Sequence, residues 1–385
     1  MKKTLLAAAL IAGFAGVAQA ETSVTLYGIL DGGIGYNKVD GTVVNRTTGV
    51  RTDYSAKKTG MINGVQSGNR WGLKGSEDLG NGLRAVFQLE SGFDLGTGNS
   101  AQGGRLFGRQ ATLGLAGDSW GQLDVGRQTN IASKYLPGVA DPFGAGFGQA
   151  NIGTSFSAAN TMRWDNLVMY QTPNFSGFQF GVGYSFNVSG NQGWDIDRPG
   201  LVNNPDEANG KGITTGLRYA NGPIGVAATY DRIEFDADDA KFTQWNLGAS
   251  YDFEVVKAMV AFGQTRDGWF QGTDFGPAVN AGGVADTSTG TFRSLDGLKV
   301  NSYLVGLTAP IGNGKLLASW QMADPSNSPD GALGEFEKQH TYSLGYTYAL
   351  SKRTNVYAIG SYAKNVVFQD DLDSTLVGVG LRHQF

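Results

Sequence analysis

Apolar and polar residues alternate along most of the chain. Between Leu83 and Glu90 the odd-numbered positions are apolar, whereas Arg84, Gln88 and Glu90 lie at even-numbered positions. The same alternation returns between Val377 and Phe385. A period of two is typical of a β-strand with one apolar and one polar face.

Sixteen segments fit this pattern. We predict strands over 24–36, 70–75, 83–91, 106–116, 123–127, 163–172, 179–186, 211–220, 224–232, 243–251, 258–267, 299–308, 315–322, 339–349, 354–363 and 376–385. Each even-numbered strand is followed by a short turn, as at 220–223, and each odd-numbered strand by a longer loop. The four longest loops are 37–69, 128–162, 187–210 and 268–298. All short turns therefore lie at one end of the sheet.

Two architectures use this many strands. A soluble sandwich or propeller buries its apolar faces between sheets, whereas a membrane barrel turns them to lipid and its polar faces to the lumen. The even strand number, the one-sided loops and terminal strands that can close the sheet favour an all-β fold, a transmembrane antiparallel 16-stranded β-barrel. After Glu21 no apolar run approaches the length of a membrane-spanning helix. A barrel of about sixteen strands encloses a water-filled channel.

The first twenty residues predict an export signal. Lys2 and Lys3 precede an apolar run over 5–17, and Ala18-Gln19-Ala20 offers the small residues that a signal peptidase accepts. The alternative is a retained anchor, for which the apolar run is too short. We expect residues 1–20 to be cleaved and 21–385 to form the barrel.

Composition excludes several other classes. Glycine is abundant, at 59 residues, but lacks the period of three that collagen requires. There is no cysteine, only two histidines (His340 and His383), and a net charge of −4 without a basic block. We therefore expect no disulfide, no metal, no cofactor and no nucleic-acid partner. If an exported barrel of this kind lies in an outer membrane, we expect it to contact the lipids and lipopolysaccharide there.

The loop over 128–162 is the longest connection and combines prolines with aromatic residues, including Pro137, Pro142, Phe143 and Phe147. A loop of this length is usually functional or disordered. This mixture predicts an ordered loop folded into the barrel. An extracellular loop is the alternative.

Several motifs in this order and spacing resemble one family. They are VTLYG at 24–28, RWGLKGSEDLGNGL at 70–83, GRQ at 126–128, NL at 166–167, QTPNFSGF at 171–178, LSKRT at 350–354 and GLRHQF at 380–385. The chain resembles the general trimeric porins of the neisserial and β-proteobacterial type. The resemblance implies a homotrimer in the Gram-negative outer membrane, whose inward-folded third loop faces a cluster of wall arginines at the pore constriction.

The wall arginines of that family fall on Arg70, Arg109 and Arg163. Alternation places Arg70 in the lumen, whereas Arg109 shares parity with lipid-facing leucines and needs a bulge or bend to point inward. The strand that contains Arg163 is apolar on both faces, so alternation does not decide whether Arg163 points into the lumen. Relatives with Pro-Glu-Phe-Gly in the third loop are matched here by Asp-Pro-Phe-Gly, so Asp141 is the loop acid expected at the constriction.

Four further residues are expected to line the lumen: Lys74, Arg84, Gln88 and Glu90. Arg127 follows the parity of Leu123 and Val125, which places it outside the lumen. The terminal Phe385 ends an alternating strand of the kind by which the outer-membrane assembly machinery recognises barrels.

These features predict a porin for passive diffusion of ions and small hydrophilic solutes. Arginines in a narrow aqueous neck repel cations and attract anions, which gives weak anion selectivity. The alternatives are an outer-membrane barrel hydrolase and an adhesin. We expect no enzyme, because His340 and His383 lie without a nucleophile motif and no separate passenger segment exists.

Overall fold

The computed structural model describes residues 23–196, 209–235, 240–273, 275–276 and 291–385. The predicted signal peptide lies outside these residues and stays a prediction. Among the described residues, no helix has the length and apolarity needed to cross a membrane.

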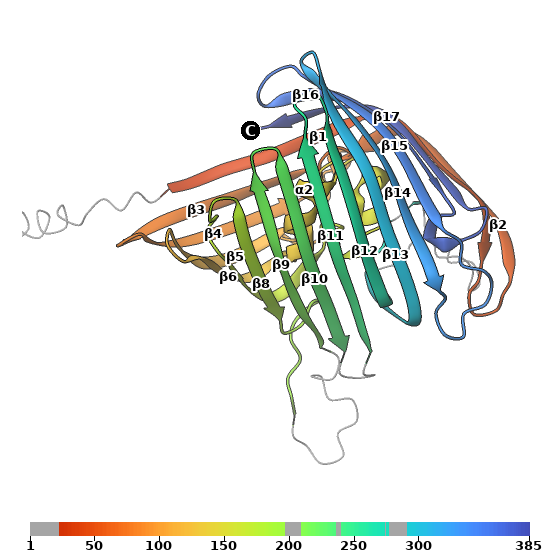
Figure 1. The fold of residues 1–385 in the computed structure, drawn as a ribbon, viewed down its shortest axis with the longest axis horizontal. Helices are drawn as coiled ribbons and strands as arrows, with labels where there is room; N and C mark the ends of the chain where they lie inside the picture. The colour runs from red at the N-terminus through yellow and green to blue at the C-terminus, as the bar shows by residue number, and fades with distance from the viewer. Residues whose placement is uncertain (1–22, 197–208, 236–239, 274, 277–290) are drawn as a thin grey trace, which may run out of the picture.

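The described chain is mostly β-structure (Figure 1). The strands are β1 (Ser23–Val44), β2 (Arg51–Asn63), β3 (Arg70–Gly80), β4 (Leu83–Gly92), β5 (Gln110–Gly117), β6 (Gly121–Thr129), β7 (Arg163–Gln171), β8 (Phe178–Ser185), β9 (Gly210–Asn221), β10 (Ile224–Phe235), β11 (Lys241–Asp252), β12 (Lys257–Gln271), β13 (Thr291–Ile311), β14 (Gly314–Asn327), β15 (Gln339–Ala349), β16 (Thr354–Lys364) and β17 (Asp373–Gln384). The helices are α2 (Ile131–Ala140) and the 3₁₀ turns η1 (Gly148–Ala150), η2 (Ile152–Thr154), η3 (Ser157–Ala159) and η5 (Val366–Phe368).

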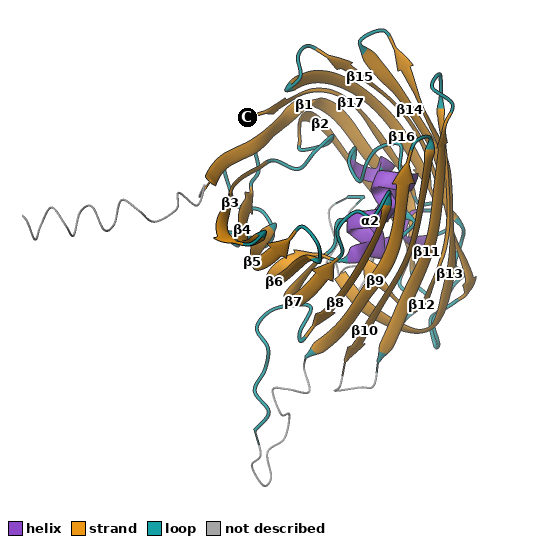
Figure 2. Cartoon of the chain, turned by 60° about the vertical axis from the view of Figure 1, so that its left-hand side comes forward, coloured by secondary structure: helices purple, strands orange, loops and turns teal. Residues whose placement is uncertain are grey.

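The strands form one closed antiparallel barrel. From β3 to β17 each strand pairs with the next, and β1 pairs with β17 to close the ring (Figure 2). On its other side, β1 pairs with β3 through its first residues and with β2 through its later ones. Because β2 and β3 share one place beside β1, the seventeen strands fill sixteen positions. The predicted 16-stranded barrel is confirmed.

The largest correction concerns the predicted loop over 37–69. It contains the second half of β1 and all of β2, which pair in register from Gly32 with Asn63 to Val44 with Arg51. The sequence of β2 carries polar residues on both faces, including the adjacent Lys57 and Lys58. No period of two therefore marked this segment as a strand.

Strand limits elsewhere differ from the prediction in both directions. The strand predicted over 299–308 extends from Thr291 to Ile311, whereas the one predicted over 106–116 begins only at Gln110. The strand over 339–349 is observed with those limits. Long strands continue past the apolar stretch that identified them, since backbone pairing continues after the alternation stops.

The distribution of exposure is the reverse of that in a soluble protein. Leu113, Leu217 and Val379 are more than half exposed on the outer wall, whereas Thr214 and Gln244 are fully buried on the inner wall. Large apolar side chains at the surface and buried polar ones inside match a barrel whose outer face contacts lipid. This arrangement excludes the sandwich and propeller alternatives.

The segment over 130–162 lies within the ring of strands (Figure 2). Ile131 and Leu136 of α2 are fully buried in one apolar cluster with Trp164 and Phe242 of the wall. Asn130 forms the N-cap of α2 and accepts a hydrogen bond from the amide of Ser133 at 3.3 Å. The chain here folds as a helix because its apolar side chains then pack against the wall strands β9 to β12.

Hydrogen bonds hold the rest of this segment against the next part of the wall, β13 to β15. The Gln321 amide donates to the carbonyl of Ala150 at 2.8 Å, and the Gln339 amide donates to that of Thr154 at 2.9 Å. The Ser302 hydroxyl donates to the carbonyl of Ser155 at 2.6 Å. The segment therefore fills the side of the lumen lined by β9 to β17, and the remaining passage runs along β3 to β7.

Candidate channel constriction

The three arginines predicted at the constriction come together at the long-loop end of β3 to β7. Arg70 begins β3, Arg163 begins β7, and Arg109 immediately precedes β5. Arg163 Nε donates to the carbonyl of Arg109 at 3.1 Å, and Arg70 Nε donates to the carbonyl of Gly68 at 2.9 Å. All three guanidinium groups are close enough to interact electrostatically.

Glu90 is the acid at the centre of this cluster. It is 6% exposed, and its Oε1 forms an ion pair with Arg109 Nε at 2.7 Å. The Tyr27 hydroxyl donates to Oε2 at 3.0 Å. Within the described chain, Arg70 and Arg163 form no ion pair of their own. Three cations therefore share one carboxylate.

Arg109 reaches Glu90 because the chain bends before β5. Residues 108 and 109 form a bend rather than a strand. Because this bend interrupts the strand alternation, Arg109 can point into the lumen although it shares the parity of the lipid-facing leucines. Gly92 and Gly68 leave room for the side chain, since a Cβ at Gly92 would approach Arg109 Cδ to 3.0 Å and one at Gly68 would approach Nη1 to 3.2 Å.

The expectation for Asp141 is corrected by its hydrogen bonds. Its carboxylate accepts from the backbone amides of Phe143, Ala145 and Ile152, at 2.9, 2.8 and 3.1 Å. The side chain is 4% exposed and forms no ion pair with a described residue. Burial raises its pKa to about 6, although the three amide donors oppose this shift. Asp141 stabilises the turn after α2 instead of facing the arginines.

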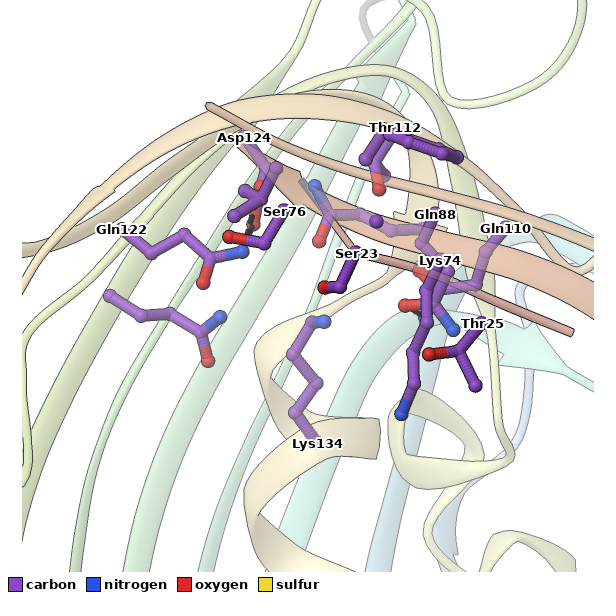
Figure 3. Close-up of a pocket in the computed structure, with 15 residues that line it drawn as sticks. Ser23, Thr25, Lys74, Ser76, Gln88, Gln110, Thr112, Gln122, Asp124 and Lys134 are labelled. Carbon is purple, nitrogen blue, oxygen red and sulfur yellow. Dashed lines mark hydrogen bonds between the residues drawn. The ribbon is translucent and has the colours of Figure 1, made fainter. Parts of the chain in front are cut away.

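Lys74, Gln88 and Glu90 share one face of the β3–β4 pair with Arg70. Lys74 and Gln88 line a cavity between these strands and α2 (Figure 3). Arg84 lies near the short-turn end of β4, where it pairs with Asp118 at 2.9 Å. It therefore belongs to the rim rather than the neck.

Some basic residues of the lumen were not singled out in the sequence, among them Lys134 and Arg382. Lys134 projects from α2 into the cavity, opposite the strands (Figure 3). Arg382 on β17 donates from Nε to the Ser67 hydroxyl at 2.9 Å and interacts electrostatically with Arg70. Arg382 occupies a polar position of the alternating last strand, so its parity was the available signal. Lys134 had none, because its helix was not predicted.

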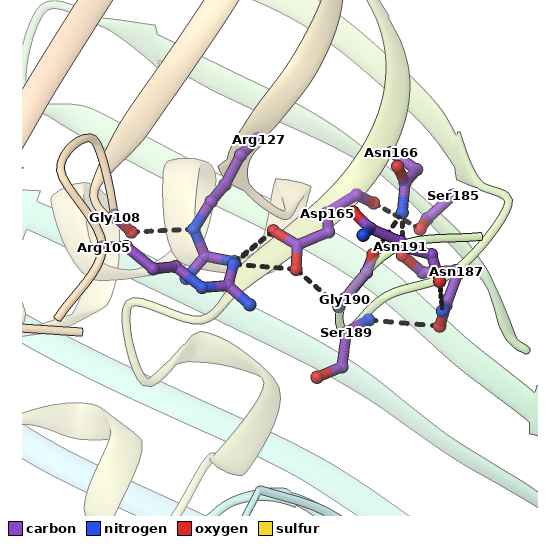
Figure 4. Close-up of polar contacts among 10 residues, drawn as sticks. All are labelled: Arg105, Gly108, Arg127, Asp165, Asn166, Ser185, Asn187, Ser189, Gly190 and Asn191. Carbon is purple, nitrogen blue, oxygen red and sulfur yellow. Dashed lines mark hydrogen bonds and ion pairs between the residues drawn. The ribbon is translucent and has the colours of Figure 1, made fainter. Parts of the chain in front are cut away.

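Arg127 forms a cluster with Asp165 and Arg105 (Figure 4), and its guanidinium also interacts electrostatically with Arg163. Asp165 Oδ1 lies 2.5 Å from Arg127 Nη1, and Oδ2 lies 2.8 Å from Arg105 Nη1. The amide of Gly190 also donates to Asp165, at 2.7 Å. The register of β6 and β7 shifts at this point. The cluster joins the loop before β5 to β6, β7 and the segment after β8, which is a structural role.

Phe385 closes the seam of the barrel. Its backbone exchanges hydrogen bonds with Gly28, at 3.1 and 3.2 Å. Its ring lies over Gly28, where an added Cβ would lie 2.3 Å from Cζ of Phe385. Only glycine allows the terminal ring this position.

A closed barrel with an outer apolar face and a charged lumen is a channel of the outer-membrane type. The Gram-negative porin family matches residues 7–366. The chain belongs to that family, and it is an outer-membrane porin.

Relatives and solved structures agree over the whole fold. An outer membrane porin protein of Bordetella pertussis is 58% identical over 398 residues, covering 100% of both chains. Outer membrane porin protein 32 of Delftia acidovorans is 32% identical, again over 100% of both. The structure of an anion-selective porin from Comamonas acidovorans superposes with a TM-score of 0.67 at 27% identity, covering 94% of this chain and 100% of that one.

Proposed function

We propose that this porin conducts ions and small hydrophilic solutes by passive diffusion, with a weak preference for anions. The observation that carries the proposal is the cluster of Arg70, Arg109 and Arg163 around the single acid Glu90. The net positive charge lies beside the passage that the inward segment leaves open.

The physical reason is the range over which charges act. Exposed loop acids such as Asp371 are screened beyond about 8 Å in physiological salt. A solute in the neck passes the arginines at close range, where screening is weaker. Guanidinium groups also remain charged at any relevant pH. The charges in the neck should therefore determine whether anions or cations are preferred. The loop acids should reduce the strength of that preference. The name of the Comamonas relative supports the same sign.

The histidines favour a channel over a hydrolase. His340 stacks on Trp320 and accepts a hydrogen bond from its indole at 3.3 Å. His383 lies beside the Thr354 hydroxyl at 2.9 Å, next to a short turn. Among the described residues, neither histidine is hydrogen-bonded to both a nucleophile and an orienting acid, the arrangement in which a histidine acts as the base of nucleophilic catalysis. The curated relatives are likewise named as porins.

We also propose that the working unit is a homotrimer, by analogy with the family. Purified protein should then show conductance steps that close in thirds. A stable monomer in mild detergent would remove the trimer and leave the barrel intact.

Reversal potentials in a salt gradient across a planar bilayer test the selectivity. Arg70→Gln should shift permeability toward cations, and Arg109→Gln and Arg163→Gln should add to the shift. Lys352→Gln, in an exposed short turn, is the matched control. If all three arginine variants keep the wild-type reversal potential, the arginines do not set selectivity.

A further inference from the structure

The lumen contains a second basic site beside the arginine cluster. A cavity of about 330 Å³ lies between α2 and the strands β3 to β6. Lys74 lies four residues beyond Arg70 on the same face of β3, which is about 13 Å farther toward the short turns. A solute that has passed the arginines meets this cavity next.

Two lysines enter the cavity from different elements. Figure 3 shows Lys134 extending from α2 toward the strands, and Lys74 extending from β3 toward the helix. Neither ammonium group forms an ion pair with any residue of the described chain. Asp124, the one acid in the lining, accepts the Gln122 amide at 2.9 Å and interacts electrostatically with Lys134. Lys74 Nζ lies 5.5 Å from the centre of the Tyr27 ring. With no described carboxylate within ion-pair distance, both ammonium groups can still donate hydrogen bonds to an anion.

The rest of the lining is rich in side-chain amides. Five glutamines contribute: Gln88, Gln110, Gln122, Gln128 and Gln171. Gln128 is 1% exposed, and its Nε2 has no hydrogen-bond partner among the described residues. A buried amide donor without a partner is costly, by about 1–3 kcal/mol, unless something in the cavity accepts from it. Amides both donate and accept, which suits hydroxyl groups.

We infer that this cavity is a weak binding site for small polyhydroxylated anions, molecules with one carboxylate or phosphate group and several hydroxyls. The lysines hold the anionic group, and the glutamines hold the hydroxyls. The inference rests on the proposed function and names a preferred solute class for the same pore. Phe87 is the only aromatic side chain in the lining, so a neutral sugar gains no stacked platform.

Single-channel current measured against solute concentration tests the site. The probes are gluconate, glucose 6-phosphate, glucose and acetate, in bilayers containing the full trimer. Interaction with gluconate should saturate in the millimolar range, whereas glucose and acetate, each with half of the required groups, should show no saturation. The measurement with glucose 6-phosphate shows whether a phosphate group can take the place of the carboxylate in the site.

Variants assign the site to its residues. Lys134→Gln and Lys74→Gln should each raise the half-saturating gluconate concentration about tenfold, the value of one charge-assisted hydrogen bond. Gln128→Leu should weaken the binding of gluconate and leave the current measured with acetate unchanged. Lys352→Gln, outside the cavity, should change nothing. Each variant is compared at equal single-channel conductance, which shows that the barrel has formed.

The outcomes separate this inference from the proposed function. A current that never saturates with gluconate, or saturation that survives Lys134→Gln, overturns the site while the anion preference stands. Equal saturation by glucose also overturns it, because the site would then recognise a neutral sugar. A wild-type channel that prefers cations contradicts the proposed function instead.

Discussion

The side-chain amide of Asn130 donates to the carboxylate of Asp231 at 2.7 Å, which joins the N-cap of α2 to the wall strand β10. Both side chains are fully buried. The same amide donates to the carbonyl of Ala158 at 2.9 Å, so the beginning and the end of the inward segment meet at one residue. The backbone amide of Ile131 adds a bond to the Thr214 hydroxyl at 2.8 Å.

Asn130→Ala should loosen the inward segment. It removes both amide bonds and the N-cap, and leaves the Asp231 carboxylate buried without that donor, a loss of about 2–4 kcal/mol. We expect larger and noisier single-channel currents, because the segment narrows the lumen. Asn191→Ala, in the loop after β8, is the control. Unchanged current noise in Asn130→Ala would show that the other contacts are sufficient to hold the segment in place.

Glu90→Gln should strengthen anion preference. The substitution removes the one carboxylate that pairs with Arg109 and keeps a group of similar shape. The reversal potential in a salt gradient should move opposite to that of Arg70→Gln. Asp118→Asn, at the rim, should have a smaller effect because its charge is exposed. A shift toward cations in Glu90→Gln would contradict the assigned geometry.

Acidic pH should stabilise the turn that follows α2. Burial raises the pKa of Asp141 to about 6, above its value in the unfolded chain. Its contribution to the free energy of unfolding is then fully present below about pH 4 and is lost as pH rises through about 6, by up to about 3 kcal/mol. Tryptophan fluorescence during urea unfolding at pH 4 and pH 7 measures this difference. Asp141→Asn should reduce it; an unchanged difference would assign the effect to other groups.

Deleting Phe385 should reduce the amount of barrel in the outer membrane. The deletion removes both the terminal ring and the backbone pairing with Gly28. Gly28→Val separates two explanations, because it displaces the ring and keeps the C-terminal residue. If recognition of the terminus limits assembly, only the deletion should lower the outer-membrane fraction. If seam packing limits it, both variants should. Normal levels of both would remove any role for this contact.

The sequence predicted what depends on alternation. Strands that contact lipid on one side and water on the other need a period of two, so residues such as Leu113 and Leu115 identified their strand. The short turns and the longer loops at opposite ends followed from the same count. Where a strand leaves this environment, as β2 does, the pattern disappears although the backbone still pairs.

The candidate site was predicted less completely, because it forms where regular structure ends. Arg109 depends on a bend whose residues, Gly108 and Arg109, carry no period. Lys134 depends on a helix that folds only against the inner wall. Asp141 has the right charge for a constriction, but its own loop supplies three amide donors to it. Such outcomes are decided by tertiary contacts that a local pattern does not contain.

The pairing of β1 with β17 has a consequence for the order of events in assembly. It joins residues 29–40 to residues 373–384, nearly the whole chain length apart. Loop closure over such a separation is slow, and every intermediate without it has two unpaired strand edges. The ring can become complete only after the last strand has been delivered across the inner membrane. Until then, its open strand edges can pair with those of other unfinished chains.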